Sequence, residues 1–313
     1  MGARDDGCDL VVRMPKPLGD FVMASVAVRL LHDLGLRLLL IGPAPINGLL
    51  GDLELETEDI GNVRTALRRA RRDGVDYALL LSSSFRSALQ ARLAGLRGIG
   101  VQRDGRKLLL SASIPRVMAE HKVEEYRELG ELAARTLGLR VRDASAYRAP
   151  RIEISEQEVA AARRQLAEAG VEGAYVVCCP TVAARHGEKK RWPGFADFYR
   201  ELAAAGVPTV TCPGPGEEEA CREAGAVGAI LEGVPLSRYS ALLGDAGAVV
   251  SNDTGVAHLA AAVGAATLTV YGDTDPARYG PRGARAEAIG REGAWPEVDE
   301  VTSRVHRLLG ASS

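Results

Sequence analysis

Short apolar runs alternate with segments of helical periodicity along both halves of the chain. In the first half, apolar runs predict strands at residues 10–14, 36–41, 77–81 and 98–101. Segments with the helical period follow them, at residues 21–34, 63–72, 86–93 and 124–137. Such alternation predicts a parallel sheet that is covered by helices on both faces.

The second half repeats the pattern. Strands are predicted at residues 174–178, 209–212, 248–251 and 266–271, with helices at 195–205, 217–223, 236–243 and 256–263. A last amphipathic helix is expected at residues 298–309, and it could pack back on the first half. Fold class is therefore α/β, with two Rossmann-like doubly wound domains.

The border between the domains is expected near residue 150. Residues 142–151 have neither period and contain Pro150, which is typical of a linker, and Ser155 with Glu158 resembles a capping box that opens a helix. With 313 residues the chain exceeds the usual size of a single core, so we expect domains at 1–150 and 151–313. Two such domains would face a central cleft, a common place for ligands.

Composition narrows the class of protein. A hydrophobic share of 46% with 26% charged residues is globular, and a net charge of −2 argues against a broad basic surface for nucleic acid. The five cysteines have no Cys-x-x-Cys spacing, so neither a zinc site nor a disulfide framework is indicated, and reduced cytosol is the expected compartment. We see no signal peptide and no apolar run long enough to span a bilayer, so we expect at most peripheral membrane contact.

The segment around Asp253 has the strongest chemical pattern. A predicted strand runs directly into Asp253, Thr254 and Gly255, and His258 lies on the first turns of the following helix. In open parallel sheets, ligands bind at the carboxyl ends of strands, and the N–H groups at a helix start favour an anion. The alternative is that these polar residues simply cap the helix.

Another polar loop follows the predicted strand that ends near residue 178. It begins near Thr181, contains a basic run from Arg185 to Arg191, and ends in Trp192 and Pro193. Cations at a strand end suit a diphosphate leaving group, whereas a solvated basic loop is the alternative. The aromatic side chain and the proline favour a loop that is anchored to its domain.

The first predicted strand is followed by a loop with two prolines, then Gly19 and Asp20. Gly19 permits close approach of the backbone. Asp20 could merely complement the dipole of the helix that starts there. Alternatively, its carboxylate projects from the strand end and serves as a general base.

Taken together and in order, these loops resemble glycosyltransferase family nine, the ADP-heptose:lipopolysaccharide heptosyltransferases. The resemblance rests on Leu18-Gly19-Asp20, on Pro180 with Lys190-Arg191-Trp192-Pro193, and on Ser251-Asn252-Asp253-Thr254-Gly255 with His258. Weaker similarities include Ser84-Phe85-Arg86-Ser87, the segment His121 to Tyr126, and Gly214 with Glu217. The chain departs from the family where Thr181-Val182 replaces Gly-Ala and where Pro17-Leu18 precedes the Gly-Asp pair.

The resemblance implies a GT-B type fold with an acceptor-side N-terminal domain and a C-terminal domain that binds the nucleotide sugar. It implies inverting transfer of heptose from ADP-heptose to a lipopolysaccharide inner-core or related acceptor, without metal or other cofactor. The expected location is cytoplasmic, where the protein could lie peripherally on the inner face of the cytoplasmic membrane. Asp20 would be the catalytic base, and Gly19 and Trp192 would shape loops. The residues that would bind the donor are Thr181, Lys190, Asp253, Thr254, Gly255 and His258.

Other functions remain open at this point. A dehydrogenase is disfavoured because neither half has Gly-x-Gly-x-x-Gly after a strand, and hydrolase and metalloprotease motifs are absent from the sequence. A sugar-nucleotide epimerase of the same fold, a transferase with another nucleotide sugar or a small-molecule acceptor, and a non-catalytic sugar-nucleotide-binding protein are the alternatives.

Overall fold

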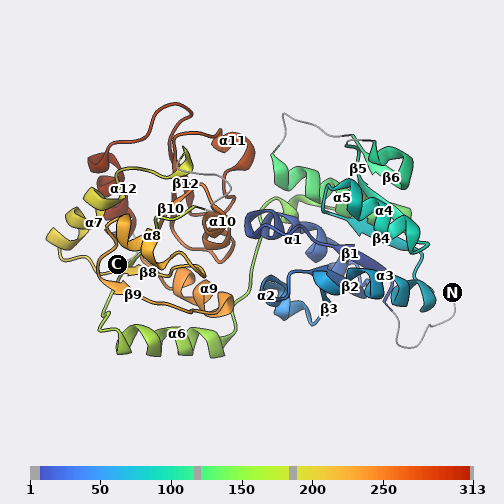
Figure 1. The fold of residues 1–313 in the computed structure, drawn as a ribbon, viewed down its shortest axis with the longest axis horizontal. Helices are drawn as coiled ribbons and strands as arrows, with labels where there is room; N and C mark the ends of the chain where they lie inside the picture. Colours follow the sequence, from blue (N-terminus) through green and yellow to red (C-terminus); the bar gives the residue numbers. More distant parts are fainter. Residues whose placement is uncertain (1–7, 104, 116–120, 183–188, 311–313) are drawn as a thin grey trace. The chain divides into compact units, whose positions relative to one another are not determined.

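The chain forms two compact units, Met1–Arg151 and Ile152–Ser313. The computed structural model describes residues 8–103, 105–115, 121–182 and 189–310 (Figure 1). Each unit is built on one six-stranded sheet in which every pair of neighbouring strands is parallel. The five cysteines are free thiols. In the part of the chain that the structure describes, no helix has the length and apolar character needed to cross a membrane.

Unit 1 alternates strands and helices along the chain. Its elements are β1 (Leu10–Arg13), α1 (Leu18–Asp33), β2 (Leu38–Gly42), α2 (Ala44–Asn47), β3 (Glu56–Asp59), α3 (Val63–Arg72), β4 (Tyr77–Leu80), α4 (Phe85–Leu93), β5 (Arg97–Val101), β6 (Leu110–Ile114) and α5 (Lys122–Thr136). Short 3-10 turns lie at η1 (Gly48–Leu53), η2 (Ile60–Asn62), η3 (Arg106–Leu109) and η4 (Ser145–Tyr147). The strand order is β3-β2-β1-β4-β5-β6.

Helices cover both faces of this sheet. On one face, α3 and α4 bury Leu67 and Ala88 against Val11 and Leu80 of the central strands. On the other face α1 packs along α5, and the two helices come so close at Gly130 that a Cβ there would lie 3.1 Å from Ala27 Cα. The core is thus formed by apolar strands between two helical layers, as the alternating pattern predicts.

Unit 2 repeats the arrangement. Its elements are α6 (Glu156–Glu168), β7 (Val176–Cys179), α7 (Phe195–Ala204), β8 (Thr209–Thr211), α8 (Glu218–Glu223), β9 (Ala229–Ile230), α9 (Leu236–Gly244), β10 (Ala248–Asn252), α10 (Gly255–Ala262), β11 (Thr267–Tyr271), α11 (Pro276–Tyr279), β12 (Ala286–Gly290) and α12 (Val298–Gly310). The order β12-β11-β10-β7-β8-β9 is the same as in unit 1, read in the opposite direction.

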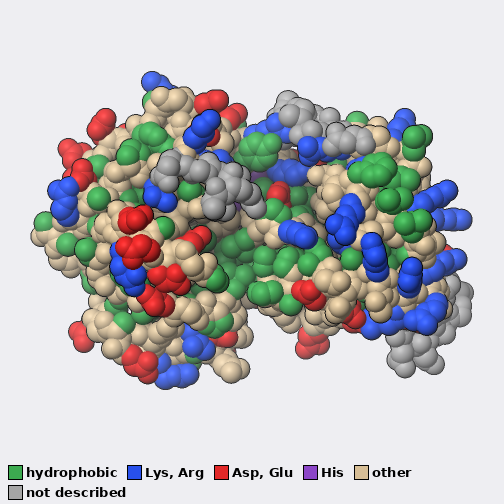
Figure 2. Space-filling model, in the orientation of Figure 1, with side chains coloured by type: hydrophobic (Ala, Val, Ile, Leu, Met, Phe, Trp, Pro, Cys, Tyr) green, Lys and Arg blue, Asp and Glu red, His purple; other side chains and the backbone are tan. Residues whose placement is uncertain are grey.

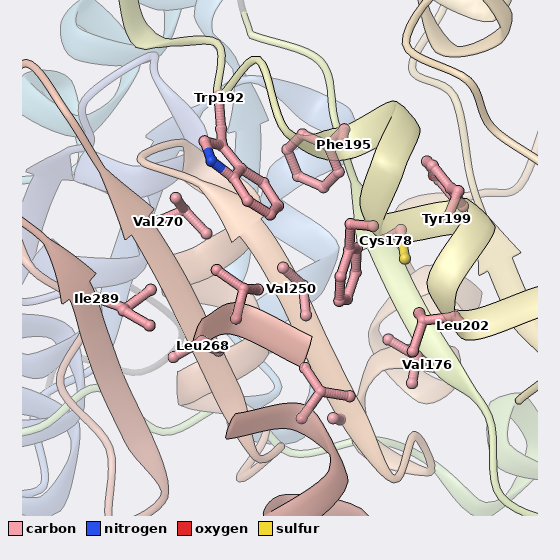
Figure 3. Close-up of a cluster of buried hydrophobic side chains, with 14 residues drawn as sticks. Val176, Cys178, Trp192, Phe195, Tyr199, Leu202, Val250, Leu268, Val270 and Ile289 are labelled. Atoms are coloured by element: carbon pink, nitrogen blue, oxygen red, sulfur yellow. The ribbon is translucent and has the colours of Figure 1, made fainter. Parts of the chain in front are cut away.

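An aromatic cluster forms the core on one face of the second sheet. Figure 3 shows Trp192 and Phe195 beside Val250 and Val270 of the central strands. The Trp192 and Phe195 rings meet edge to face, with 5.1 Å between their centroids. The last helix, α12, buries Val301 and Val305 in the same core, so its apolar side is used inside unit 2.

The four central strands of each sheet confirm the predicted strands to within two residues at each end. The sequence analysis missed β3, β6, β9 and β12, which are the edge strands of the two sheets. Helix α1 begins at Leu18, three residues earlier than predicted, so Gly19 and Asp20 belong to its first turn. Pro17 occupies the N-cap position with φ −66° and ψ 138°, a backbone that lets the helix start directly after it.

The strand order fixes where ligands can bind. In this topology the chain reverses its direction of travel across the sheet between β1 and β4 in unit 1, and between β7 and β10 in unit 2. Loops at the carboxyl ends of these neighbouring strands leave toward opposite faces and open a crevice between them. The segments that follow these strands carry Asp20, in the first turn of α1, and Lys190 and Asp253 in unit 2.

Candidate functional site

Helix α10 begins at the switch point of unit 2. Thr254 is the N-cap residue, with φ −136° and ψ 174°, but its side chain makes no cap hydrogen bond; its Oγ1 lies 3.3 Å from Ser251 Oγ instead. The N–H groups after Gly255 are therefore not satisfied by the N-cap side chain. Backbone donors and the helix dipole together favour an anion at this position.

Lys190 and Asp253 meet beside that helix start. Lys190 Nζ lies 2.5 Å from Asp253 Oδ2, and Thr274 Oγ1 donates a hydrogen bond of 2.7 Å to the same oxygen. The side chains of Lys190 and Asp253 are 19% and 9% exposed, so the pair is largely sheltered from water. An ammonium group is thus held at the carboxyl end of β10 before any ligand arrives.

Asn252 joins the loop after β7 to the end of β10. Its Nδ2 donates to the Pro180 carbonyl at 2.7 Å, and its Oδ1 accepts from Trp192 N–H at 2.8 Å. The Trp192 indole donates to the Pro296 carbonyl at 3.1 Å and packs in the aromatic core. Both described ends of the loop that leads to Lys190 are therefore anchored, and Arg185 and His186 of the basic run lie outside the described residues.

The side chain of Thr181 is hydrogen-bonded to a carboxylate. Its Oγ1 donates to Glu217 Oε2 at 2.7 Å, and Gly214 N–H reaches the same oxygen at 3.3 Å. Glu217 was no more than a weak similarity in the sequence, yet its carboxylate lies directly against a predicted donor-binding side chain. A carboxylate placed here can accept hydrogen bonds from sugar hydroxyl groups.

His258 lies on α10 and is 6% exposed, so the structure buries most of its imidazole. Tyr271, at the end of β11, was not singled out as a ligand in the sequence. Its hydroxyl is buried and has no hydrogen-bond partner among the residues that the structure describes. Burial, and then the negative charge of Asp253, raise the pKa of Tyr271 above its ordinary value, which keeps a neutral O–H donor near Asp253.

In unit 1, Asp20 is the third residue of α1 and accepts a hydrogen bond of 3.2 Å from the Tyr126 hydroxyl on α5. Burial raises the pKa of Tyr126 well above its ordinary value, and the Asp20 carboxylate adds to the shift. Lys122 Nζ lies 4.8 Å from the centroid of the Tyr126 ring and pairs with Glu125. Tyr126 therefore remains a hydrogen-bond donor that orients the Asp20 carboxylate.

Arg13, the last residue of β1, was not identified from the sequence. It is 9% exposed, and its Nε and Nη1 atoms are buried without a hydrogen-bond partner within the described part of the chain. Burial, and then the nearby charge of Arg86, lower its pKa. Because an unpaired buried cation is unfavourable, an anion at this strand end would stabilise the guanidinium.

Comparison with known proteins places this geometry in a family. A family model described as Glycosyltransferase family 9 (heptosyltransferase) matches residues 63–306. The chain belongs to glycosyltransferase family 9. It is accordingly a glycosyltransferase, and its two parallel six-stranded sheets form the GT-B fold of heptosyltransferase structures. No curated protein sequence matched the chain.

Solved structures of this family match over nearly full length. E. coli ADP-heptose lipopolysaccharide heptosyltransferase II is 25% identical, with a TM-score of 0.77 and coverage of 97% of this chain and 99% of that one. A glycosyltransferase family 9 structure from Veillonella parvula is 17% identical, with a TM-score of 0.75 and coverage of 100% and 97%. E. coli heptosyltransferase WaaC with ADP is 20% identical, with a TM-score of 0.69 and coverage of 96% and 99%.

One of the more distant structures is described as containing a metal. The E. coli glycosyltransferase TibC, described as iron-containing and dodecameric, is 14% identical with a TM-score of 0.55 over 98% of this chain and 76% of that one. Among the side chains that the structure of this family 9 member describes, no three His, Cys, Asp or Glu residues gather as a metal site would require.

Proposed function

We propose that this family 9 enzyme is an inverting heptosyltransferase that moves heptose from ADP-heptose to a lipopolysaccharide inner-core acceptor or a related glycan. The observation that carries the proposal is the sheltered Lys190–Asp253 pair beside the uncapped start of α10. The same arrangement could serve another nucleotide sugar. Heptose is favoured because the chain is 25% identical to an ADP-heptose enzyme over 97% of its length.

The donor is assigned to unit 2. Its diphosphate would receive hydrogen bonds from the N–H groups after Thr254 and Gly255, and would compete with Asp253 for the Lys190 ammonium. As the bond from sugar to phosphate breaks, negative charge builds on the leaving oxygen, so a cation held there stabilises the transition state more than the ground state. Asp253 and Glu217 would accept hydrogen bonds from sugar hydroxyls, with Thr181 beside Glu217.

We keep His258 among the residues proposed to bind the donor. Because it is mostly buried on α10, its contact with donor would need a small shift of that helix or a rotation of its imidazole. Trp192 and Gly19 would act by shaping their loops. Trp192 does so through its indole bond and its aromatic packing, and Gly19 by being buried in the first turn of α1.

The acceptor is assigned to unit 1. Asp20 would take the proton of the attacking hydroxyl, which then displaces the diphosphate from the opposite face of the sugar and inverts its configuration. The Tyr126 hydrogen bond at 3.2 Å fixes one carboxylate oxygen and leaves the other for the acceptor. Arg13 would bind a phosphate or carboxylate of the acceptor, a class of group that suits an unpaired buried guanidinium.

Lys190 supplies the positive charge that other transferases take from a metal ion, so we include metal independence in the proposal. A lipopolysaccharide acceptor is anchored in a membrane by its lipid. We therefore place the enzyme at the inner face of the cytoplasmic membrane.

The test is ADP release from ADP-heptose by the purified enzyme, with and without a heptose-deficient lipopolysaccharide core, in buffer that contains EDTA. We expect release that requires the acceptor and yields a glycan one heptose heavier by mass spectrometry. Without acceptor, conversion of ADP-heptose to another ADP-sugar would instead support an epimerase, and release of ADP would support a hydrolase. The first outcome is relevant because UDP-N-acetylglucosamine 2-epimerases share the fold at 12% identity.

An Asp20→Asn variant separates chemistry from binding. General-base catalysis contributes about 10²- to 10⁴-fold, so kcat should fall by about that factor while donor affinity stays unchanged. Unaltered kcat in this variant would remove Asp20 from the mechanism.

A further inference from the structure

Exposed hydrophobic side chains are concentrated on one face of unit 1. Six large hydrophobic residues are exposed in the described part of the chain, and four belong to α4 and η3. They are Phe85 (48% exposed), Leu89 (37%), Leu93 (76%) and Leu108 (90%). Arg106 Nη2 lies 3.5 Å from Ser87 Oγ, which ties η3 to α4.

Helix α4 arranges these side chains as a stripe with cations on either side. Phe85, Leu89 and Leu93 are spaced by four residues, so at about 100° per residue they cover an arc of about 80°. Around the helix axis, Arg92 lies about 20° to one side of this stripe and Arg86 about 20° to the other side. The opposite side of the helix buries Ser87, Ala88 and Ala91, so the stripe lies on the side of α4 that faces away from the core.

We propose that this α4–η3 face, formed by Phe85, Leu89, Leu93 and Leu108 with Arg86, Arg92 and Lys107, docks the enzyme on an anionic lipid bilayer. Figure 2 shows hydrophobic side chains gathered over α4 with Lys and Arg side chains around them. Protruding aliphatic side chains among cations insert between headgroups while the cations meet the phosphates. The core of a protein interface is, by contrast, depleted of charge.

Charge along this segment supports a bilayer as the partner. Residues 85–110 contain six Lys and Arg, all exposed except the buried Arg106, against one acidic residue, although the whole chain has a net charge of −2. Arg86, Arg92 and Lys107 are all exposed. Contact is peripheral, because α4 has nine residues, far fewer than a helix needs to span a bilayer.

The experiment is co-sedimentation of the full chain with vesicles, measured without donor or acceptor, so its outcome is independent of the heptosyl transfer proposed above. Vesicles of phosphatidylcholine with about one third phosphatidylglycerol are compared with pure phosphatidylcholine. We expect binding to the anionic vesicles that weakens as salt is added, since salt screens the exposed cations. No sedimentation of the parent protein with anionic vesicles overturns the proposal.

Variants separate the apolar and cationic contributions. Leu93→Glu with Leu108→Glu should lower vesicle partition at least about tenfold, because it removes the two most exposed apolar side chains. Val227→Glu, a matched change of an exposed residue (43%) in unit 2, should leave partition unchanged. Arg92→Ser with Lys107→Ser should weaken binding to anionic vesicles and flatten its salt dependence.

Two results contradict membrane docking even if the protein sediments. Equal partition of the Leu93→Glu, Leu108→Glu variant and the Val227→Glu control would show that another surface binds lipid. A parent dimer in solution that the leucine variant converts to monomer, without any effect of vesicles, would show that a second copy of the chain covers this face.

Discussion

At the residue scale, the proposed catalytic base Asp20 and the proposed donor-binding residue Asp253 have one feature in common. A neutral hydroxyl donates to each carboxylate: Tyr126 to Asp20 and Thr274 to Asp253. Such a bond orients a carboxylate without neutralising it, whereas the Lys190 ammonium also balances the charge of Asp253. The carboxylate in unit 1 is thereby suited to accept a proton, and the pair in unit 2 is suited to exchange partners with a diphosphate.

Lys190→Ala tests that exchange. Loss of the ammonium should lower kcat/KM for ADP-heptose by about 10- to 100-fold, because a hydrogen bond to a charged group contributes about 1.5–3 kcal/mol. Steady-state kinetics with varied donor measure the effect. The control is Lys189→Ala, which removes the neighbouring exposed lysine and should change little. If the two variants behave alike, Lys190 has no special part in donor use.

Sequence reasoning found the residues at strand ends and missed their partners. Asp20, Lys190 and Asp253 stand next to recognisable strands or motifs, so their places follow from local pattern. Tyr126 belongs to the segment from His121 that gave only a weak family similarity, and its contact with Asp20, 106 residues away along the chain, does not follow from any local pattern. Arg13 was missed because a strand-end arginine is usually solvated, and burial is a property of the folded sheet.

At the element scale, the missed strands have a common physical cause. An edge strand is paired on one side and partly exposed, so it needs no apolar run. β3 reads Glu-Thr-Glu-Asp and is exposed or half-buried throughout, and β9 has two residues. Central strands are covered on both faces and must be apolar, as β1 and β7 are. Hydrophobic pattern therefore predicts the middle of these sheets and not their borders.

The close approach of α1 and α5 allows the helix that carries Asp20 to be perturbed without a change of Asp20 itself. Gly130→Val would place side-chain atoms against Ala27, where even a Cβ lies 3.1 Å from Ala27 Cα. We expect a loss of about 1–3 kcal/mol in the free energy of unfolding, as for other overpacked cores. Urea denaturation measures it.

A second substitution shows whether the clash between residue 130 and Ala27 causes the loss of stability. Ala27→Gly in the Gly130→Val background should recover part of the lost stability, although Ala27→Gly alone costs about 1 kcal/mol in a helix. Strictly additive effects of the two changes would mean that the helices do not meet at this point. Because α1 carries Asp20 and α5 carries Tyr126, kcat should follow the same pattern.

At the scale of the whole molecule, the buried thiols of Cys179 and Cys221 and the half-buried thiol of Cys8 make the fold less stable at alkaline pH. Burial raises the pKa of Cys8 and Cys221 to about 11 and that of Cys179 to about 12, from an ordinary value of 9.0. Above pH 9 the unfolded chain loses these protons while the folded chain keeps them. Stability from these thiols is complete below pH 9 and falls as pH rises toward 11–12.

Urea midpoints between about pH 8 and about pH 9.5 measure this effect, because the tyrosines of the unfolded chain are already half ionised at about pH 10. The free energy of unfolding changes by up to about 1.4 kcal/mol per pH unit for each buried thiol, and by less for the half-buried Cys8, because water screens it. In the Cys8→Ala variant, the free energy of unfolding should fall less steeply with rising pH, because one titrating thiol is missing. A midpoint that does not change over this range would show that the thiols titrate alike in the folded and unfolded chains.

Asn252 has a consequence for how this enzyme could be altered. Its one side chain holds Pro180 and Trp192 at the same time, through two hydrogen bonds of opposite direction. A substitution of Asn252 would therefore alter the segment after β7 and the position of Trp192 together, so evolution and design meet these two parts of unit 2 as one unit of change.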